Sequence, residues 1–519
     1  MIINLGDKEL PKQWEITKLP DFTNVVMGQS PLSETYNLDK DGLPFFQGKT
    51  EFGAIYPKIN KYCSKPNKIA EEGATLLSVR APVGPTNLAK TRCCIGRGLA
   101  AIHPIGGVDP KFIFLLLRSI ELNLAGEGTG STFKAITKAY VDELTFAVPP
   151  LNEQKRIVAK IEELFSELDN GLTALKTARE QLKVYRQALL KHAFEGKLTA
   201  KWREENADKL ETPEQLLARI QKERDTSYQQ QLEAWKVAIK EWEVKGKEGK
   251  KPGKPIKPKN LEILSQIEVS KLGDIPSDWS WIKLGGIALV GTGITPLKSK
   301  SFYYEAGDIA WVTSGALNNS FVKKPSSYVT EKALNETNLR LYPEHTLVVA
   351  LYGEGKTRGK CSELLLEATI NQAIAAIILE GVSSELRKFV KWFLTKNYEN
   401  MRLFASGGVQ PNLNLSIIEN MLVPLCSIPE AQEIASQLDQ NFSEIDKLDL
   451  DIEEQIVKSE ALRQSILKKA FSGKLVPQDT NDEPTSELLT RIRAVKEQKK
   501  QPTNKSAIKR SRKKVSNEA

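Results

Sequence analysis

The apolar positions of this 519-residue chain follow two different periods. In residues 157–189 and 434–466, apolar side chains recur at steps of three and four, and spacing near 3.5 sustained over such a length predicts a coiled-coil helix. The predicted seam positions are Ile157, Ile161, Leu164, Leu168, Leu172, Leu175, Leu182, Tyr185 and Leu189 in the first helix, and Ile434, Leu438, Phe442, Ile445, Leu448, Ile452, Ile456, Leu462 and Ile466 in the second.

Before each long helix the pattern changes to short β-rich runs separated by Gly, Pro and Asn, which predicts a mixed α/β domain. The runs are LLSV and LAAI in the first region, and TLVVALY and AIAAIIL in the second. Each region also contains one predicted helix, DPKFIFLLLRSIEL in the first and SSELRKFVKWFLTKNYENMRLF in the second. We expect a domain at 1–149, a long helix at 150–198, a helical insert and linker at 199–260, a second domain at 261–427, a second long helix at 428–475 and a tail at 476–519.

These two regions are copies of one another. QALLKHAFEGKL (187–198) and QSILKKAFSGKL (464–475) share eight of twelve positions at a spacing of 277. LPKQWEITKL matches IPSDWSWIKL at a spacing of 265, ATLLSV matches HTLVVA at 271, and IGRGLAAI matches INQAIAAI at 275. A spacing that only grows along the chain is what insertions in the second copy would produce. The chain therefore carries an internal duplication.

Both long helices are predicted to stop in the same way. Gly196 and Gly473 stand where a helix accepts a left-handed residue, and Leu198 and Leu475 can fold back onto the last turn. Two long amphipathic helices in one chain most simply pair with each other. We therefore expect an α+β protein in which two similar mixed α/β domains are separated by two long antiparallel coiled-coil helices, related by a pseudo-two-fold axis.

The net charge of +9 is concentrated in two stretches, with +6 in residues 245–259 and +8 in residues 493–519. Such stretches attract phosphates without sequence preference, or they serve only solubility, and both interpretations remain open. The longest apolar runs are far shorter than a membrane span, and no secretory signal is visible. Together with five cysteines that lack CxxC spacing, this predicts a cytoplasmic protein with reduced thiols.

Complete catalytic motifs are missing from the sequence. QGKT (47–50) and EGKT (354–357) lack the first glycine of a phosphate-binding loop, and GEGTG (126–130) follows a predicted helix instead of a strand. The three histidines show no local pairing for acid–base or metal chemistry. This pattern favours recognition and assembly over catalysis.

The duplicated pattern P..W....L followed by G..P, with helices that open at PLNEQKRI or IPEAQEIA and close at AF.GKL, resembles the specificity subunit of type I restriction–modification systems. The resemblance implies two target-recognition domains that each read half of a split double-stranded DNA sequence, with no catalysis in this chain. It also implies two adenine-methyltransferase subunits and further restriction subunits as partners, which would hold S-adenosylmethionine, ATP and Mg²⁺. One departure is Ala431, where the family usually has a glutamine like Gln154.

Candidate DNA contacts lie in polar or Gly-rich loops at equivalent places in the two copies. They are Gln29, Ser30, Gln47, Lys49, Arg80, Ser131, Thr132 and Lys134 in the first copy, and Thr292, Thr295, Tyr352, Lys356, Arg358, Asn371, Gln372 and Gln410 in the second. The resemblance also marks helix caps and partner-docking candidates, which are Glu153, Gln154, Phe194, Gly196, Lys197, Glu430, Phe471, Gly473 and Lys474.

Two other functions compete with this one. The chain could be a nuclease or methyltransferase with scattered active-site residues, which turnover of DNA by the isolated chain would reveal. It could also be a coiled-coil adaptor without a DNA role, which binding without sequence preference in the presence of its partner would support.

Overall fold

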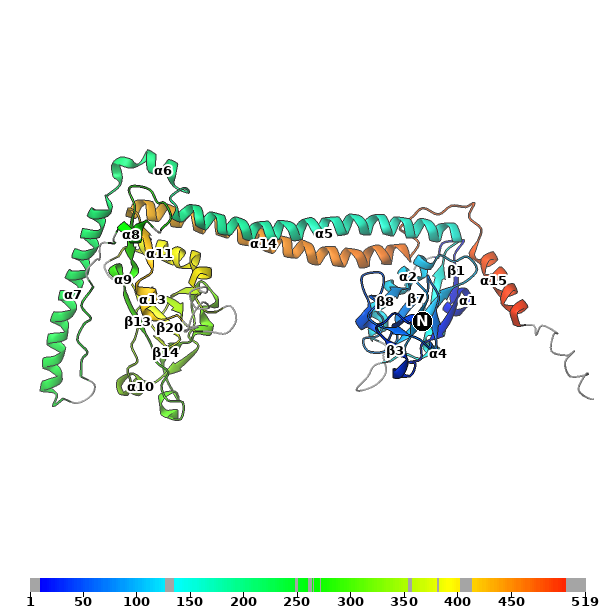
Figure 1. The fold of residues 1–519 in the computed structure, drawn as a ribbon, viewed down its shortest axis with the longest axis horizontal. Coiled ribbons are helices and arrows are strands. Elements are labelled where there is room, and N and C mark those ends of the chain that lie inside the picture. Colours follow the sequence, from blue (N-terminus) through cyan, green and yellow to red (C-terminus); the bar gives the residue numbers. More distant parts are fainter. Residues whose placement is uncertain are drawn as a thin grey trace, which may run out of the picture. The chain divides into compact units, whose positions relative to one another are not determined.

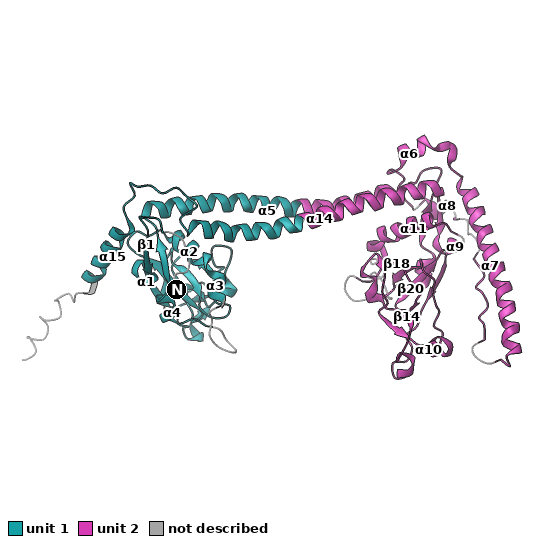
Figure 2. Ribbon diagram, turned by 180° about the vertical axis from the view of Figure 1, so that it is seen from behind, with its two compact units in different colours: residues 1–177, 452–519 teal, residues 178–451 magenta. Residues whose placement is uncertain are grey.

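The computed structural model describes residues 10–126, 135–247, 251–259, 264, 266–270, 272–352, 357–379, 382–401 and 413–500. The chain forms two compact units (Figure 2): unit 1 contains residues 1–177 and 452–519, and unit 2 contains residues 178–451. Each unit holds one α/β domain, here called head 1 or head 2, and part of both long helices. Among the described residues, no helix combines the length and apolar character needed to cross a membrane.

Head 1 is built on a four-stranded antiparallel sheet in the order β2-β10-β7-β8 and a five-stranded sheet in the order β3-β5-β4-β9-β6. Strand β1 pairs with β11, which closes the head just before the first long helix. The strands are β1 Glu15–Lys18, β2 Thr23–Met27, β3 Tyr36–Asn37, β4 Leu43–Phe46, β5 Tyr62–Cys63, β6 Ile69–Ala70, β7 Thr75–Ser78, β8 Thr86–Leu88, β9 Cys93–Ile95, β10 Leu99–Pro104 and β11 Thr145–Val148. The helices are α1 Leu19–Phe22, α2 Pro110–Ser119, α3 Glu121–Gly126 and α4 Lys138–Asp142.

Head 2 repeats this plan with the sheets β13-β20-β17-β18-β15 and β16-β14-β19 and the closing pair β12-β21 (Figure 1). The strands are β12 Ser280–Lys283, β13 Leu289–Thr292, β14 Ile309–Val312, β15 Phe321–Val322, β16 Ser327–Val329, β17 Leu347–Ala350, β18 Cys361–Leu364, β19 Thr369–Ile370, β20 Ile374–Ile378 and β21 Leu422–Leu425. The helices are α8 Gln266–Val269, α9 Leu284–Ile287, α10 Glu331–Glu336, α11 Ser384–Lys396 and α13 Leu415–Glu419. The predicted fold class of two similar mixed α/β domains with long helices is confirmed.

Strand pairing corrects one of the repeat spacings. Leu77 lies opposite Ala100 in head 1, and Val349 lies opposite Ala375 in head 2. With the β10 and β20 strands aligned at 275, β7 and β17 therefore correspond at a spacing of 272, and the spacing of 271 was wrong by one residue. Both strands are buried along their whole length, so no alternation of apolar and polar residues fixes their register.

The predicted helix of head 2 is interrupted once. α11 ends at Lys396, one turn residue follows at Asn397, and residues 398–401 are helical again. The Asn397 side-chain amide donates to the Phe393 carbonyl at 3.0 Å, and such a bond to the preceding backbone competes with the regular helix at this point. The last predicted residues, 402–404, lie outside the described residues. In head 1, α2 begins as predicted, because the Asp109 side chain accepts from the Lys111 N–H at 2.8 Å.

The two long helices are α5 Leu151–Phe194 and α14 Ile428–Ala470, of 44 and 43 residues. In unit 1 the side chains of Asp169 and Arg463 form an ion pair, and in unit 2 Arg186 pairs with Asp446. Early residues of one helix thus meet late residues of the other, which confirms the antiparallel pairing inside each unit.

The seam of the helix pair differs from the prediction at three positions. Tyr185, Leu448 and Leu462 are 50%, 50% and 48% exposed. Beside two of them, Arg186 lies 5.4 Å from the Phe442 ring centroid, and Arg463 lies 4.9 Å from that of Phe165. The aliphatic stem and flat guanidinium of arginine pack well against a ring, so the neighbouring arginine occupies the seam.

The insert and the tail make equivalent contacts. The insert contains α6 Ala200–Glu205 and α7 Pro213–Val244, and the tail contains α15 Thr485–Lys500. Leu216 and Ile220 of α7 are buried in the core of unit 2, whereas Leu488 and Ile492 of α15 are buried in the core of unit 1. The segments EQLLARIQ (214–221) of the insert and SELLTRIR (486–493) of the tail are similar in sequence, and each belongs to a helix that packs on one head.

Candidate nucleic-acid interface

Three loops of head 1 meet at one place. The backbone N–H of Gln29, after β2, donates to the Ile95 carbonyl at 3.1 Å, and the Ser30 hydroxyl accepts from the Arg97 N–H at 3.3 Å. Gln47, after β4, lies beside the same β9–β10 turn, because a Cβ added at Gly96 would stand 3.1 Å from its Cα. The structure thus brings Gln29, Ser30 and Gln47 together, and Gln29 and Gln47 are exposed.

Head 2 assembles the same three loops. The Thr292 hydroxyl donates to the Ile374 carbonyl at 2.8 Å, and the Thr295 hydroxyl donates to Gln372 Oε1 at 2.5 Å. Asn371 lies in the same turn, and its N–H donates to the Val312 carbonyl at 3.1 Å. Four candidates from two separate segments are therefore neighbours here as well.

One glycine in each head makes this close approach possible. A Cβ at Gly28 would collide with the Gly96 carbonyl, and a Cβ at Gly293 would collide with the Ile370 carbonyl. Any other residue would push the two loops apart, which explains why both copies keep glycine at this position of the repeat.

Two residues of this cluster were missed by the sequence analysis. Arg97, in the β9–β10 turn of head 1, occupies the position that Gln372 occupies in the β19–β20 turn of head 2. Thr313 follows β14 in the same way as Gln47 follows β4. The spacing of 275 already paired Arg97 with Gln372, so the duplication itself carried the signal. Thr313 stands in a stretch where no sequence match had been found.

The remaining candidates lie at varying distance from this cluster or outside the described part of the chain. Arg80 is exposed and forms a backbone bridge with Ala135, and the corrected spacing of 272 places Tyr352 at the same position of head 2. Lys49 is exposed at the start of a short 3-10 helix, and the buried Nε of the half-buried Arg358 has no hydrogen-bond partner among the described residues. The candidates outside the described residues are Ser131, Thr132, Lys134, Lys356 and Gln410.

The chemistry of the cluster suits the edges of DNA bases. Glutamine pairs in a bidentate way with adenine, arginine does so with guanine, and threonine contacts either a polar edge or a thymine methyl. In head 2, Gln372 Oε1 already accepts from Thr295, so its amide NH₂ is the group directed to other acceptors. Because the loop backbones are hydrogen-bonded to strand ends, these side chains stand on a fixed frame.

The repeated helix ends have the predicted glycine cap. Gly196 and Gly473 have φ values of +68° and +71°. The Lys197 N–H donates to the His192 carbonyl at 2.9 Å, and the Lys474 N–H donates to the Lys469 carbonyl at 3.0 Å. This six-to-one bond with a left-handed glycine is the Schellman motif.

Each helix end packs against the head of the other copy. A Cβ at Gly473 would stand 2.5 Å from Pro11 Cγ, and the Phe471 ring lies 5.6 Å from that of Phe112 in head 1. In unit 2, Gly196 packs against the start of head 2 at Pro276, and the rings of Phe194 and Phe389 lie 5.1 Å apart. The repeated sequence at the helix ends (187–198 and 464–475) therefore forms the contact between the helix of one copy and the head of the other.

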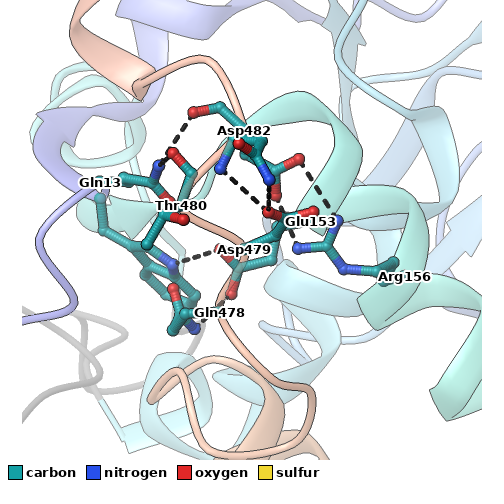
Figure 3. A network of polar contacts seen from close by, with 9 residues as sticks. Gln13, Glu153, Arg156, Gln478, Asp479, Thr480 and Asp482 are labelled. Atoms are coloured by element: carbon teal, nitrogen blue, oxygen red, sulfur yellow. Dashed lines mark hydrogen bonds and ion pairs between the residues drawn. The ribbon is translucent and has the colours of Figure 1, made fainter.

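A buried carboxylate completes each of these contacts. The Trp14 indole N–H donates to Glu153 at 2.9 Å, and the Trp279 indole N–H donates to Glu430 at 2.9 Å. Burial raises the pKa of Glu153, although hydrogen bonds from Trp14 and from Gln478, at 2.7 Å, oppose the rise. Figure 3 shows this network of unit 1, in which the helix residue Glu153 accepts from both the head and the tail residue Gln478.

Equivalent carboxylates have different second partners in the two units. Gln478, which follows the second helix, donates a hydrogen bond to Glu153. Thr199 and Arg203, which follow the first helix, both donate to Glu430 at 2.8 Å. The chain after each helix thus closes the contact, but with different residue types.

Most of the predicted docking residues are buried inside this chain. Gln154, for example, donates to the Pro149 carbonyl at 2.9 Å, a bond that Ala431 cannot make in the other copy. Lys197 and Lys474 are exposed. The buried members, which anchor helix to head, are Glu153, Gln154, Phe194, Gly196, Glu430 and Phe471.

Two copies of one α/β head, each joined to part of an antiparallel helix pair and each presenting a fixed polar loop cluster, define a duplicated recognition protein. The family model for the type I restriction modification DNA specificity domain matches residues 11–178 and 276–458. The chain belongs to this family, and it is a specificity subunit that recognises DNA sequence. Specificity subunits lack catalytic activity, which resides in other subunits of such systems.

Relatives of known name support this assignment. The chain is 22% identical to the type I restriction enzyme EcoDI specificity subunit of Escherichia coli, over 92% of each chain. It is 38% identical to a Methanocaldococcus jannaschii protein provisionally named the type I restriction enzyme MjaX specificity subunit, over 37% of this chain and 45% of that one.

Among solved structures, the HsdS subunit of Thermoanaerobacter tengcongensis is 16% identical, with a TM-score of 0.54 over 90% of this chain and 99% of that one. A chain from a structure on complex assembly and conformational transition of the type I R-M system gives a TM-score of 0.60 at 16% identity, over 90% and 100%. These two similarities establish the fold.

Proposed function

We propose that each head reads one half of an asymmetric, bipartite DNA target through its loop cluster. The observation that carries this proposal is that both heads have the same loop frame but different side chains on it. Gln47 and Arg97 in head 1 stand where Thr313 and Gln372 stand in head 2. Different donors and acceptors on one frame select different bases.

Binding strength and base choice come from different groups in this proposal. Each bidentate pair between a side chain and a base edge contributes about 1–3 kcal/mol of discrimination, whereas phosphate contacts fix register and orientation. The heads are close to neutral, with net charges of +2 for residues 1–148 and 0 for residues 261–427. We therefore propose that much of the phosphate contact comes from other parts of the assembled complex.

The same proposal gives this chain two kinds of partner subunit. Two methyltransferase subunits would bind this chain at equivalent surfaces, and restriction subunits would join them in the cytoplasm. Exposed Lys197 and Lys474 follow the two repeated helix ends, and Val184 and Leu450 leave apolar surface uncovered on α5 and α14. S-adenosylmethionine, ATP and Mg²⁺ would be bound by these partners, which carry out methyl transfer and cleavage.

Methylome sequencing tests this function directly. The chain is expressed with its methyltransferase partner in a host without other adenine methylation, and the methylated motif is mapped. We expect one motif with two specified halves and an unspecified spacer. The variant Q47A/R97A should relax one half only, and the matched variant T313A/Q372A should relax the other half only. A single contiguous motif, or a change in both halves from one variant, would contradict the proposal.

A further inference from the structure

A basic segment lies outside the loop clusters, in the chain that follows α7. Residues 251–259 read KPGKPIKPK, with proline at every third position. A period of three is that of a polyproline II helix, in which residues three apart share one face. The segment contains neither helix nor strand, and its prolines are covered to differing degrees: Pro252 and Pro255 are half-buried and Pro258 is buried. The prolines therefore form its packed face.

This segment returns along α7 and is held by two tryptophans of that helix. Trp235 and Trp242 stand seven residues apart, which places them on one side of α7. The Trp235 indole N–H donates to the Pro252 carbonyl at 3.0 Å. The Lys254 ammonium lies 6.0 Å from the Trp235 ring centroid, and that of Lys251 lies 6.0 Å from the Trp242 ring centroid. The tryptophans and the prolines thus order a stretch that composition alone marks as a loose linker.

The consequence is a fixed row of positive charge. Lys251, Lys254 and Lys257 are exposed, and on a polyproline II helix they recur on one face at intervals of about 9 Å. Lys259 is not part of this row, because its ammonium forms an ion pair with Glu419 at 2.6 Å. Residues 245–259 carry a net charge of +6, whereas α7 itself carries a net charge of −1. The positive charge therefore lies on the returning segment.

We propose that this lysine row binds the phosphate backbone of duplex DNA outside the bases read by head 2, without sequence preference. Cations that recur at a regular interval match the evenly spaced phosphates of a uniform polyanion, whereas a protein interface depends mainly on an apolar core. Within unit 2, α7 runs alongside head 2, and its C-terminal end reaches the level of α10 (Figure 1). The row thus belongs to the unit that carries head 2, and the inference rests on the proposed DNA reading by this head but not on which bases it reads.

The salt dependence of binding tests the row. The full-length chain with its methyltransferase partner is titrated against a duplex that lacks the methylated motif, at several salt concentrations. Each phosphate contact contributes about 0.9 to the slope of log K against log salt, so K251Q/K254Q/K257Q should make the slope shallower by about 2–3. The variant K251R/K254R/K257R should keep the original slope. The control K222Q/K236Q/K240Q removes three charges from α7 itself and should change the slope by less than about 1.

A second readout separates this inference from the proposed function. The methylated motif should be identical for the original chain and for K251Q/K254Q/K257Q, because the loop clusters are untouched. An unchanged salt slope for this variant would overturn the inference and leave the proposed function intact. An unchanged slope together with lost binding of another subunit would identify an acidic protein surface as the occupant instead, which also overturns it.

Discussion

At the residue scale, the glycines that end the long helices are the most constrained positions of the repeat. Gly473 has a left-handed backbone and touches Pro11 and Trp14 of head 1, and Gly196 has the same conformation against Pro276. Gly171, in contrast, lies inside α5, where an added Cβ would meet no atom of the described residues within 4 Å apart from its own chain neighbours and helix backbone. The same residue type is therefore required at two sites and merely tolerated at a third.

This contrast gives a matched stability prediction. Gly473→Ala should destabilise unit 1 by about 1–3 kcal/mol, because an L-residue is strained at this φ and its Cβ would displace Pro11. Gly171→Ala should stabilise the chain by about 0.5–1 kcal/mol, because glycine is a poor residue inside a helix. Urea unfolding monitored through tryptophan fluorescence measures both. Equal effects of the two substitutions would show that the Pro11 contact contributes nothing.

Residue contacts were predictable only where the duplication pointed to them. Gly28 and Gly293 were found by alignment of the copies, and Arg97 could have been found in the same way. The bond from Trp14 to Glu153 was not predictable, because it joins residues 139 positions apart, and no local pattern reports on such a contact. Both residues had been singled out, but their bond follows only from the fold.

At the element scale, the sequence predicted the existence and direction of the long helices but not every residue of their shared seam. A spacing of three or four residues leaves two neighbouring residues as candidates for the seam at each turn. The more hydrophobic candidates, Tyr185 and Leu462, were therefore predicted instead of their neighbours. The structure uses Arg186 and Arg463, because each has both a phenylalanine ring and an aspartate within reach. These pairs repeat at a spacing of 277, so the charged residues also carried the signal of the duplication.

We expect the attachment of the tail to depend on pH. Arg156 Nη2 lies 2.6 Å from Asp482 Oδ2, and this hydrogen bond holds the pKa of the buried Asp482 below its ordinary value. Because the pKa is lower in the folded chain than in the unfolded chain, the bond stabilises the tail at pH values above the ordinary carboxyl pKa of about 3.9. The stabilisation is lost as the pH falls through the lowered folded value.

Asp482→Asn should therefore loosen the tail at neutral pH. We expect hydrogen exchange in α15 to quicken at pH 7, reflecting a loss of about 1–3 kcal/mol for a charged hydrogen bond. At pH values below the folded pKa of Asp482, the original chain and the variant should exchange alike. Glu483→Gln is the control, because its partner Arg491 lies within the tail itself. If D482N leaves hydrogen exchange in α15 unchanged at pH 7, then the packing of Leu488 and Ile492 alone holds α15 on head 1.

At the scale of the whole molecule, the duplication predicted the architecture well. Each copy contributes a head and a long helix, and the compact units nevertheless exchange helix ends, so that unit 1 contains residues 452–519. The pairing of helices had been inferred from their amphipathic faces. The residues that each helix end contacts could not be inferred, because the segments HAFEGKL and KAFSGKL around Phe194 and Phe471 differ at only two positions.

The helices should set the spacer between the two halves of the DNA target. Seven residues inserted into α5 after Gly171, together with seven into α14 after Ser459, keep the 3.5-residue repeat and lengthen the pair by about 10 Å. On length alone this corresponds to about three base pairs. We expect methylome sequencing to show a longer spacer between unchanged half-sites. Insertion into α5 alone is the control and should abolish methylation, and altered half-sites would refute the proposed role.

The division of the units along the chain also dictates an order of events during synthesis on the ribosome. Head 1 is translated first, yet its core includes Phe471, Leu488 and Ile492 from the far end of the chain. Unit 2 is one continuous stretch, residues 178–451, and is complete earlier. At roughly 5–20 residues per second, synthesis from the end of head 1 to Ile492 takes on the order of 17–70 seconds, during which this apolar surface stays open. We therefore expect nascent head 1 to be prone to aggregation until the last helix emerges.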